Sequence, residues 1–67
     1  MTISYEKLWK LVEDNKMKRQ DLARAAEISA NTVTKLGKNE VVALEVLLRI
    51  CKVFHCDIGD IMEVIED

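Results

Sequence analysis

The chain of 67 residues contains no proline, only two glycines, and one each of tryptophan, tyrosine and phenylalanine. The absence of proline leaves its helical patterns uninterrupted. No apolar run reaches the roughly 18 residues that a membrane-spanning helix needs, so a membrane protein is excluded. Low-complexity segments and internal repeats are also missing. We therefore expect one domain over residues 1–67, and a small one that buries only about 60% of its unfolded surface.

Residues suited to catalysis or metal binding are scarce. One histidine and no clustered carboxylates leave little basis for an enzyme. Two cysteines are too few for a disulfide framework, and Cys51 lies in an apolar run typical of a buried position. The spacing of Cys51, His55 and Cys56 matches no common zinc pattern and lacks a fourth ligand. We expect no metal, no cofactor and no small-molecule ligand, and two free thiols.

The beginning of the chain indicates its compartment. It carries Glu6, Lys7 and Lys10 and has no apolar core of a signal peptide. A cytoplasmic protein follows as the default expectation.

The charge is unevenly distributed. The whole chain has a formal net charge of −2, which alone argues against a nucleic-acid partner. Residues 16–38, however, hold six cationic side chains against two carboxylates, a net of +4. Residues 40–67 hold two cations against seven carboxylates, a net of −5. Because local potential steers association more than total charge does, the basic third is the candidate contact surface.

Apolar spacing predicts five helices and no confident strand. The expected ranges are about 4–14, 18–26, 30–37 and 44–54, with a fifth helix after Asp57. In the first helix Ser4 is a plausible cap, Asn15 suits a left-handed C-terminal residue, and an apolar stripe faces the core. This stripe comprises Tyr5, Leu8, Trp9 and Val12. A Val41–Val42 strand is too short to matter, and Gly37 to Asn39 form an exit turn.

The two C-terminal helices are expected to build the core. The helix over 44–54 is apolar nearly all round, except for a stripe on which Glu45 and Arg49 can pair. In the fifth helix Asp57 is the expected cap, with Asp60 in the first turn. Its apolar face can close the core or meet a second subunit, and this makes its residues dimer candidates. They are Ile58, Ile61, Met62 and Ile65.

Residues 17–36, MKRQDLARAAEISANTVTKL, carry the most information. A short helix with Leu22 and Ala23 on its apolar face breaks near Glu27, and a second helix begins after Ser29, a potential cap. Val33 and Leu36 face inward in the second helix. Its other face is polar and cationic without a carboxylate, as a helix in a DNA major groove requires. This face carries Asn31, Thr34, Lys35 and Lys38.

This stretch resembles the helix-turn-helix of the Xre/Cro repressor family, and the segments YEKLWKLVEDN and LEVLLRICKVFHCDIGDIMEVIE resemble a compact subgroup of that family. The resemblance implies an all-α, five-helix, lambda-repressor-like domain with the helix-turn-helix at about 18–37. It implies base contacts from Ala30, Asn31, Thr34 and Lys35, and phosphate contacts from Lys18, Arg19 and Lys38.

Three positions depart from the family pattern. Glu27 stands where the family prefers glycine, so either it adopts a positive φ at a cost of roughly 1 kcal/mol or another residue closes the turn. Arg19 replaces a glutamine, which keeps a phosphate or guanine contact but changes the sequence preference. Ala43 stands where a serine or threonine cap is expected, which costs about 1 kcal/mol.

The leading functional interpretation is a sequence-specific transcriptional regulator that binds double-stranded DNA as a homodimer on a pseudo-palindrome. The alternative is a protein-binding module on the same fold, such as an antirepressor or antitoxin. The acidic C-terminal half favours the alternative, because it does not help binding to phosphate. A salt-dependent gel shift separates the two hypotheses.

Overall fold

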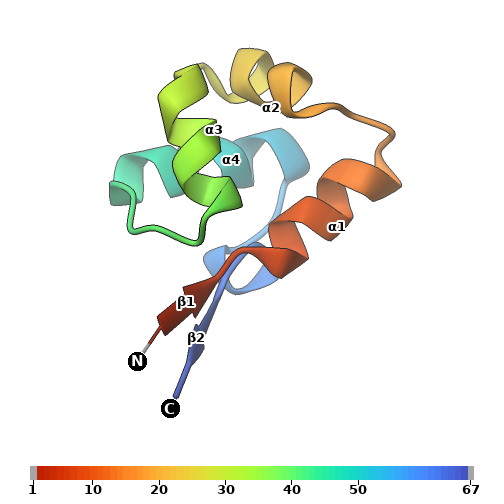
Figure 1. Cartoon of the computed structure of the whole chain (residues 1–67). Coiled ribbons are helices and arrows are strands. Elements are labelled where there is room, and N and C mark those ends of the chain that lie inside the picture. The colour runs from red at the N-terminus through yellow and green to blue at the C-terminus, as the bar shows by residue number, and fades with distance from the viewer. Residues whose placement is uncertain (1, 67) are drawn as a thin grey trace.

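The computed structural model describes residues 2–66. In this range it contains four α-helices, a short 3-10 turn and a two-stranded antiparallel sheet (Figure 1). The elements in order are β1 (Thr2–Ser4), α1 (Glu6–Asp14), α2 (Arg19–Ala26), α3 (Ala30–Gly37), α4 (Leu44–Phe54), η1 (Ile58–Asp60) and β2 (Glu63–Ile65). Figure 1 shows both chain ends beside the sheet, at the end of the molecule away from α2.

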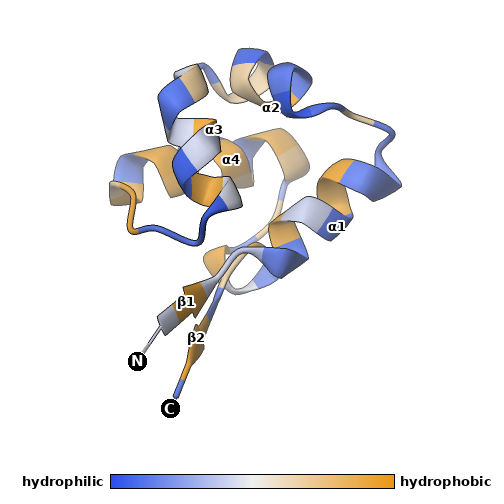
Figure 2. Cartoon of the chain, in the orientation of Figure 1, coloured by the Kyte–Doolittle hydropathy of each residue, from blue (hydrophilic) through white to orange (hydrophobic). Residues whose placement is uncertain are grey.

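A single apolar core joins the helices. Leu8 of α1, Leu22 of α2, Leu36 of α3 and Ile50 of α4 each have 0% of their surface exposed. Figure 2 shows α4 as largely hydrophobic, whereas the segment leading from α1 into α2 is largely hydrophilic. The four helices therefore share one core, and the connecting segments add the partly buried side chains of Met17, Ile28 and Val42 to it.

The expected ranges of α2, α3 and α4 agree with the structure to within one residue. The first helix begins at Glu6 instead of Ser4, because Ser4 ends β1. Ser4 still acts locally, since its Oγ accepts a hydrogen bond of 3.2 Å from the Glu6 N–H. The left-handed residue after α1 is Lys16, with φ 54°, and not Asn15, whose φ is −92°.

The expected fifth helix is wrong, and so is the expectation of no strand. The chain after Asp57 makes only the 3-10 turn η1, and Glu63–Ile65 then pairs antiparallel with Thr2–Ser4. Asp57 N–H donates to Asp60 Oδ2 at 3.0 Å, which closes the turn. Val64 and Ile65 are β-branched and suit a strand once a partner is present. That partner lies at the other end of the sequence, so local periodicity does not reveal it.

Helix α4 is also less buried than its composition indicates. Its core side is formed by Leu47, Ile50 and Cys51. Leu44 is 60% exposed and Leu48 is 54% exposed, so the helix is not covered on all sides. The predicted ion pair on its outer stripe is confirmed, with 3.1 Å between Arg49 Nη2 and Glu45 Oε1.

Helix α4 begins without a side-chain cap. Ala43 occupies the cap position with extended backbone angles, φ −63° and ψ 144°. A serine there can accept a hydrogen bond from a free amide of the first turn, so Ala43→Ser is expected to stabilise the domain by roughly 0.5–2 kcal/mol. Denaturant unfolding should show a higher midpoint at unchanged slope. Ala43→Val, which adds bulk without an acceptor, is the control and should not raise the midpoint.

The two cysteines are not paired: Cys51 is buried and Cys56 is half-buried. Burial raises the pKa of the Cys51 thiol, which makes it a poor nucleophile at neutral pH. Residues 2–66 contain no cluster of three or more side chains arranged to hold a metal ion. Among the same residues, no helix has the length and apolar character to cross a membrane.

Candidate nucleic-acid interface

Helices α2 and α3 are joined by a three-residue turn with defined backbone geometry. Glu27 adopts the left-handed conformation, with φ 57° and ψ 47°, and Ile28 N–H donates to the Ala23 carbonyl at 3.0 Å. Ser29 then caps α3, because its Oγ accepts from Thr32 N–H at 3.1 Å. The predicted cap at Ser29 is confirmed, and of the two alternatives for Glu27 the structure shows the positive φ. The turn therefore fixes the angle at which α3 leaves α2.

Arg49 of α4 forms a hydrogen bond with this turn. Its Nη1 donates a 2.8 Å hydrogen bond to the Glu27 carbonyl, while its Nη2 contacts Glu45. The carbonyl is one of the groups at the end of α2 that has no partner within its own helix. The arginine therefore ties α4 to the helix-turn-helix through the strained residue itself.

The strain at Glu27 yields a stability prediction. Glycine adopts this left-handed conformation without a Cβ clash, and the Arg49 hydrogen bond uses only backbone of residue 27. Glu27→Gly is therefore expected to raise the free energy of unfolding by about 1 kcal/mol. Glu27→Ala removes the same carboxylate but keeps the Cβ, and should give no comparable gain. A midpoint equal for both variants in urea unfolding would contradict the prediction.

The outer face of α3 is exposed. The four residues expected to face bases are all exposed, whereas Val33 and Leu36 on the other side are buried. These four are Ala30, Asn31, Thr34 and Lys35. The Thr34 hydroxyl donates to the Ala30 carbonyl at 3.1 Å, which leaves its oxygen able to accept from a ligand. Within residues 2–66 the Asn31 and Lys35 side chains have no hydrogen-bonding partner.

Cations flank this face. Lys18 precedes α2 and Lys38 follows α3, and both are exposed. The Asp21 carboxylate caps the start of α2, where its Oδ2 accepts a hydrogen bond from the Lys18 N–H at 2.9 Å. Exposed cations therefore lie before α2 and after α3, beside a helix face that carries no carboxylate, and this charge distribution fits a polyanion.

A shallow hollow of about 290 Å³ lies between α2 and α3 on this outer side. Its lining residues are Arg19, Gln20, Ala23, Ala30, Val33 and Thr34. Arg19 and Gln20 thus lie next to two of the predicted base-facing residues. Sequence reasoning missed Gln20, although its place beside Arg19 in the first turn of α2 was a usable signal.

Arg19 is exposed, but its guanidinium contacts another helix. Its Cζ lies 4.5 Å from the centre of the Trp9 ring, a cation–π contact between α2 and α1. The apolar spacing of α1 predicts Trp9 in the core, but this residue is only half-buried.

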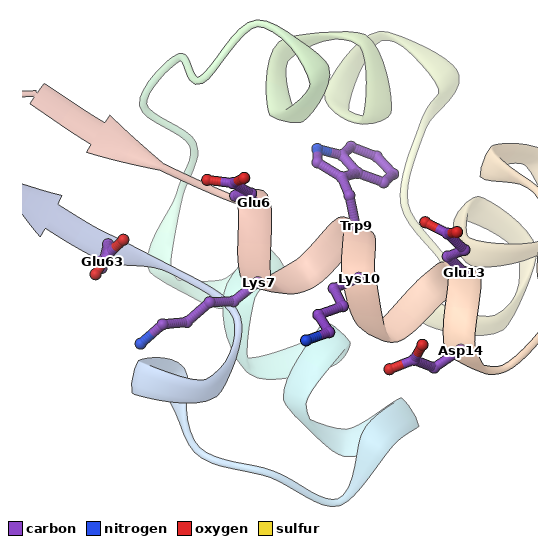
Figure 3. Close-up of a pocket in the computed structure, with 7 residues that line it drawn as sticks. All are labelled: Glu6, Lys7, Trp9, Lys10, Glu13, Asp14 and Glu63. Atoms are coloured by element: carbon purple, nitrogen blue, oxygen red, sulfur yellow. The ribbon is translucent and has the colours of Figure 1, made fainter.

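A second hollow, of about 550 Å³, lies elsewhere, on the outer side of α1 (Figure 3). Its lining residues are Glu6, Lys7, Trp9, Lys10, Glu13, Asp14 and Glu63. Figure 3 shows the Trp9 ring rising from one side of α1 while Lys7 and Lys10 extend on the other. With four carboxylates against two lysines, this hollow does not suit a phosphate backbone.

The dimer candidates fall into separate environments. Ile61 is 0% exposed and belongs to the core of its own chain, with Ile58 and Met62 packed against that core. Ile65 lies on β2 and is 43% exposed, beside Val64 at 56%. The structure therefore leaves strand β2, and not a helical face, as the apolar surface at this end of the chain.

Comparisons with known proteins agree with this geometry. Residues 7–67 match a family model described as a Cro/C1-type HTH DNA-binding domain. The fold is similar to the crystal structure of the transcriptional regulator VanUg, Form II, with a TM-score of 0.91 and 50% sequence identity. That alignment covers 98% of this chain and 88% of the other. The comparison with curated proteins gave no similar relative.

Proposed function

Because the chain belongs to the Cro/C1-type helix-turn-helix family of DNA-binding domains, we propose that it is a sequence-specific transcriptional regulator with α3 in the major groove. The exposed outer face of α3, cationic at its flanks and without a carboxylate, is the observation that carries the proposal. The likeness to VanUg, a transcriptional regulator, supports the regulatory role.

The residues on this face have the chemistry for direct base readout. Asn31 can form a two-hydrogen-bond contact with adenine, and Lys35 can donate to guanine O6 and N7. Ala30 can pack on a thymine methyl group, and the Thr34 oxygen can accept from an exocyclic amine. The internal hydrogen bond of Thr34 to Ala30 fixes its rotamer and so favours acceptance over donation.

The flanking cations set affinity and register. Lys18, Arg19 and Lys38 contact phosphates on the two sides of the groove, and each contact releases a condensed counterion. The overall charge of −2 does not oppose this, because residues 16–38 carry +4. Close-range potential at the contact surface is screened less than that of acidic groups farther away.

One copy of the domain offers few base contacts, so the functional unit is a homodimer on a pseudo-palindromic operator. The longest dimension of the chain is 33 Å. Two copies side by side can therefore place their α3 helices about 34 Å apart, the distance between successive major-groove faces. The subunit contact includes exposed Ile65 on β2, with Ile58 and Met62 alongside, whereas buried Ile61 does not take part.

Assembly is tested by sedimentation over a range of concentrations, with and without duplex DNA. Ile65→Lys places a charge on an exposed strand position, so it should shift the equilibrium toward monomer without loss of fold. Thr2→Lys alters the cross-strand partner of Ile65 and serves as control for the sheet itself. A wild-type chain that stays monomeric at high micromolar concentration, even on DNA, would remove the dimer from the proposal.

Selection of binding sites from random duplex DNA tests the function as a whole. We expect enrichment of two related half-sites whose centres are about one helical turn apart. Enrichment of a single half-site would support DNA reading without a dimer. No enrichment, with a folded protein, would favour the protein-binding module instead.

A further inference from the structure

The guanidinium of Arg19 in α2 contacts residues of two other helices, although the residue as a whole is exposed. On one side it stacks over the Trp9 ring of α1, with 4.5 Å from Cζ to the ring centre. It also lies close to Gly37, the last residue of α3. These residues border a small hollow of about 260 Å³, to which Ser4, Glu6 and Asn39 also contribute.

The contact with Gly37 depends on the missing side chain. A Cβ added at residue 37 would lie 2.5 Å from Arg19 Nη1 and 3.2 Å from Cζ. The distance to Nη1 is far below ordinary contact, so the flexible tip of the arginine would have to move away. The backbone does not require glycine here, because Gly37 is helical and has no positive φ. Close approach by Arg19 is the reason that the structure offers for a glycine at this position.

Stacking leaves the hydrogen-bonding edge of the guanidinium available. Within the described part of the chain Arg19 forms no hydrogen bond and no ion pair, so its donors are unused. The same side chain also lines the outer hollow beside Ala30 and Thr34 of α3. The Arg19 side chain thus contacts Trp9 and also borders the α3 face that the proposed function assigns to DNA.

We infer that Trp9 and Gly37 are positioning residues that hold the Arg19 guanidinium in place for a DNA phosphate at the edge of the α3 groove. The inference rests on the proposed function and adds two residues to it. A long arginine side chain loses rotamer freedom when it is immobilised by a ligand, which weakens binding. Stacking on an aromatic face and contact with the glycine backbone hold the side chain before DNA arrives.

The substitution Gly37→Ala should change DNA affinity without lowering folding stability, so it tests the positioning role separately from the fold. Alanine is the better helix former, and only the flexible tip of Arg19 opposes its Cβ, so the melting temperature should hold or rise. Displacement of Arg19 should nevertheless weaken DNA binding about three- to tenfold. Gly59→Ala is the matched control, because a Cβ at residue 59 meets nothing within 4 Å. It should leave affinity unchanged.

A double-mutant cycle shows whether Gly37 acts through Arg19. Arg19→Ala should weaken binding and lower the salt slope by about one unit, as expected for one lost phosphate contact. Gly37→Ala should then have no further effect in the Arg19→Ala background. Trp9→Leu should weaken binding like Gly37→Ala, and Trp9→Phe, which keeps an aromatic face, should recover most of the loss.

The single tryptophan of the chain reports on the stack in the free protein. Arg19→Ala and Gly37→Ala should both increase acrylamide quenching of Trp9 fluorescence, because the ring face becomes accessible. Unchanged quenching in Arg19→Ala would contradict the stacking of the Arg19 guanidinium on the Trp9 ring. An equal loss of affinity from Gly37→Ala in both backgrounds, or no loss in the wild-type background, would overturn the positioning role while leaving the proposed function intact. Absence of any duplex binding by the wild type would overturn both.

Discussion

Replacing Asn31 or Lys35 by alanine is expected to weaken binding to the preferred operator by roughly 1–3 kcal/mol. Both side chains are exposed on the outer face of α3 and have no hydrogen-bonding partner within residues 2–66. Each substitution should also relax the preference at particular base pairs, because a direct base contact is lost. Competition titrations with operators changed at single base pairs measure this effect. Equal losses on every sequence would indicate that the two residues do not read bases.

The flanking cations should behave differently. Lys18→Ala and Lys38→Ala should weaken binding to all sequences and lower the salt slope by about one unit for each lost phosphate contact. Lys10→Ala removes the same charge from α1, on the side away from Trp9 in Figure 3, and should leave the slope unchanged. A melting curve for each variant keeps loss of fold separate from loss of contact.

The second large effect concerns the inner face of the same helix. Leu36 is 0% exposed and holds α3 in the core, so Leu36→Ala should lower the free energy of unfolding by about 2–5 kcal/mol. A domain of this size has only a few kcal/mol of stability, and much of the variant should be unfolded at room temperature. Far-ultraviolet circular dichroism during urea unfolding measures the loss.

Lys35→Ala is the control for Leu36→Ala, because the two residues are adjacent, Lys35 is exposed and Leu36 is buried. Its unfolding midpoint should stay close to that of the wild type while its DNA affinity falls. A Leu36→Ala protein with a near-wild-type midpoint would mean that α3 is not anchored through this side chain. The pair thus separates the two faces of α3 by measurement.

The helix-turn-helix was predictable because its signals are local. The boundaries of α3 follow from a serine before the first turn and inward residues three apart, and the structure confirms both the cap and the burial of Val33 and Leu36. Glu27 was a conditional prediction, and the structure selects the strained alternative. Here the fold of the surrounding helices outweighs the preference of one residue for negative φ.

The C-terminal end was not predictable from local pattern. Isoleucine and valine residues after Asp57 match a helical face in spacing, but β2 forms because Thr2–Ser4 is available as its partner. The exposure of Leu44 and Leu48 was missed for a related reason. An apolar side chain can be buried, but the elements that pack beside it decide whether it is.

The Arg19 stack was missed because it joins three helices. The apolar stripe of the first helix placed Trp9 in the core, and no local rule links it to an arginine ten residues later or to Gly37. Sequence reasoning nonetheless placed Arg19 among the phosphate contacts. The structure adds how the side chain is held.

The most direct measurement is binding of the wild-type protein to duplex DNA from low to physiological salt, followed by mobility shift. A DNA-binding domain with this cationic flank is expected to form a complex at low salt, with an affinity that falls linearly with salt on logarithmic axes. No complex at low salt, where electrostatic attraction is strongest, from protein shown to be folded, would contradict the DNA-regulator function.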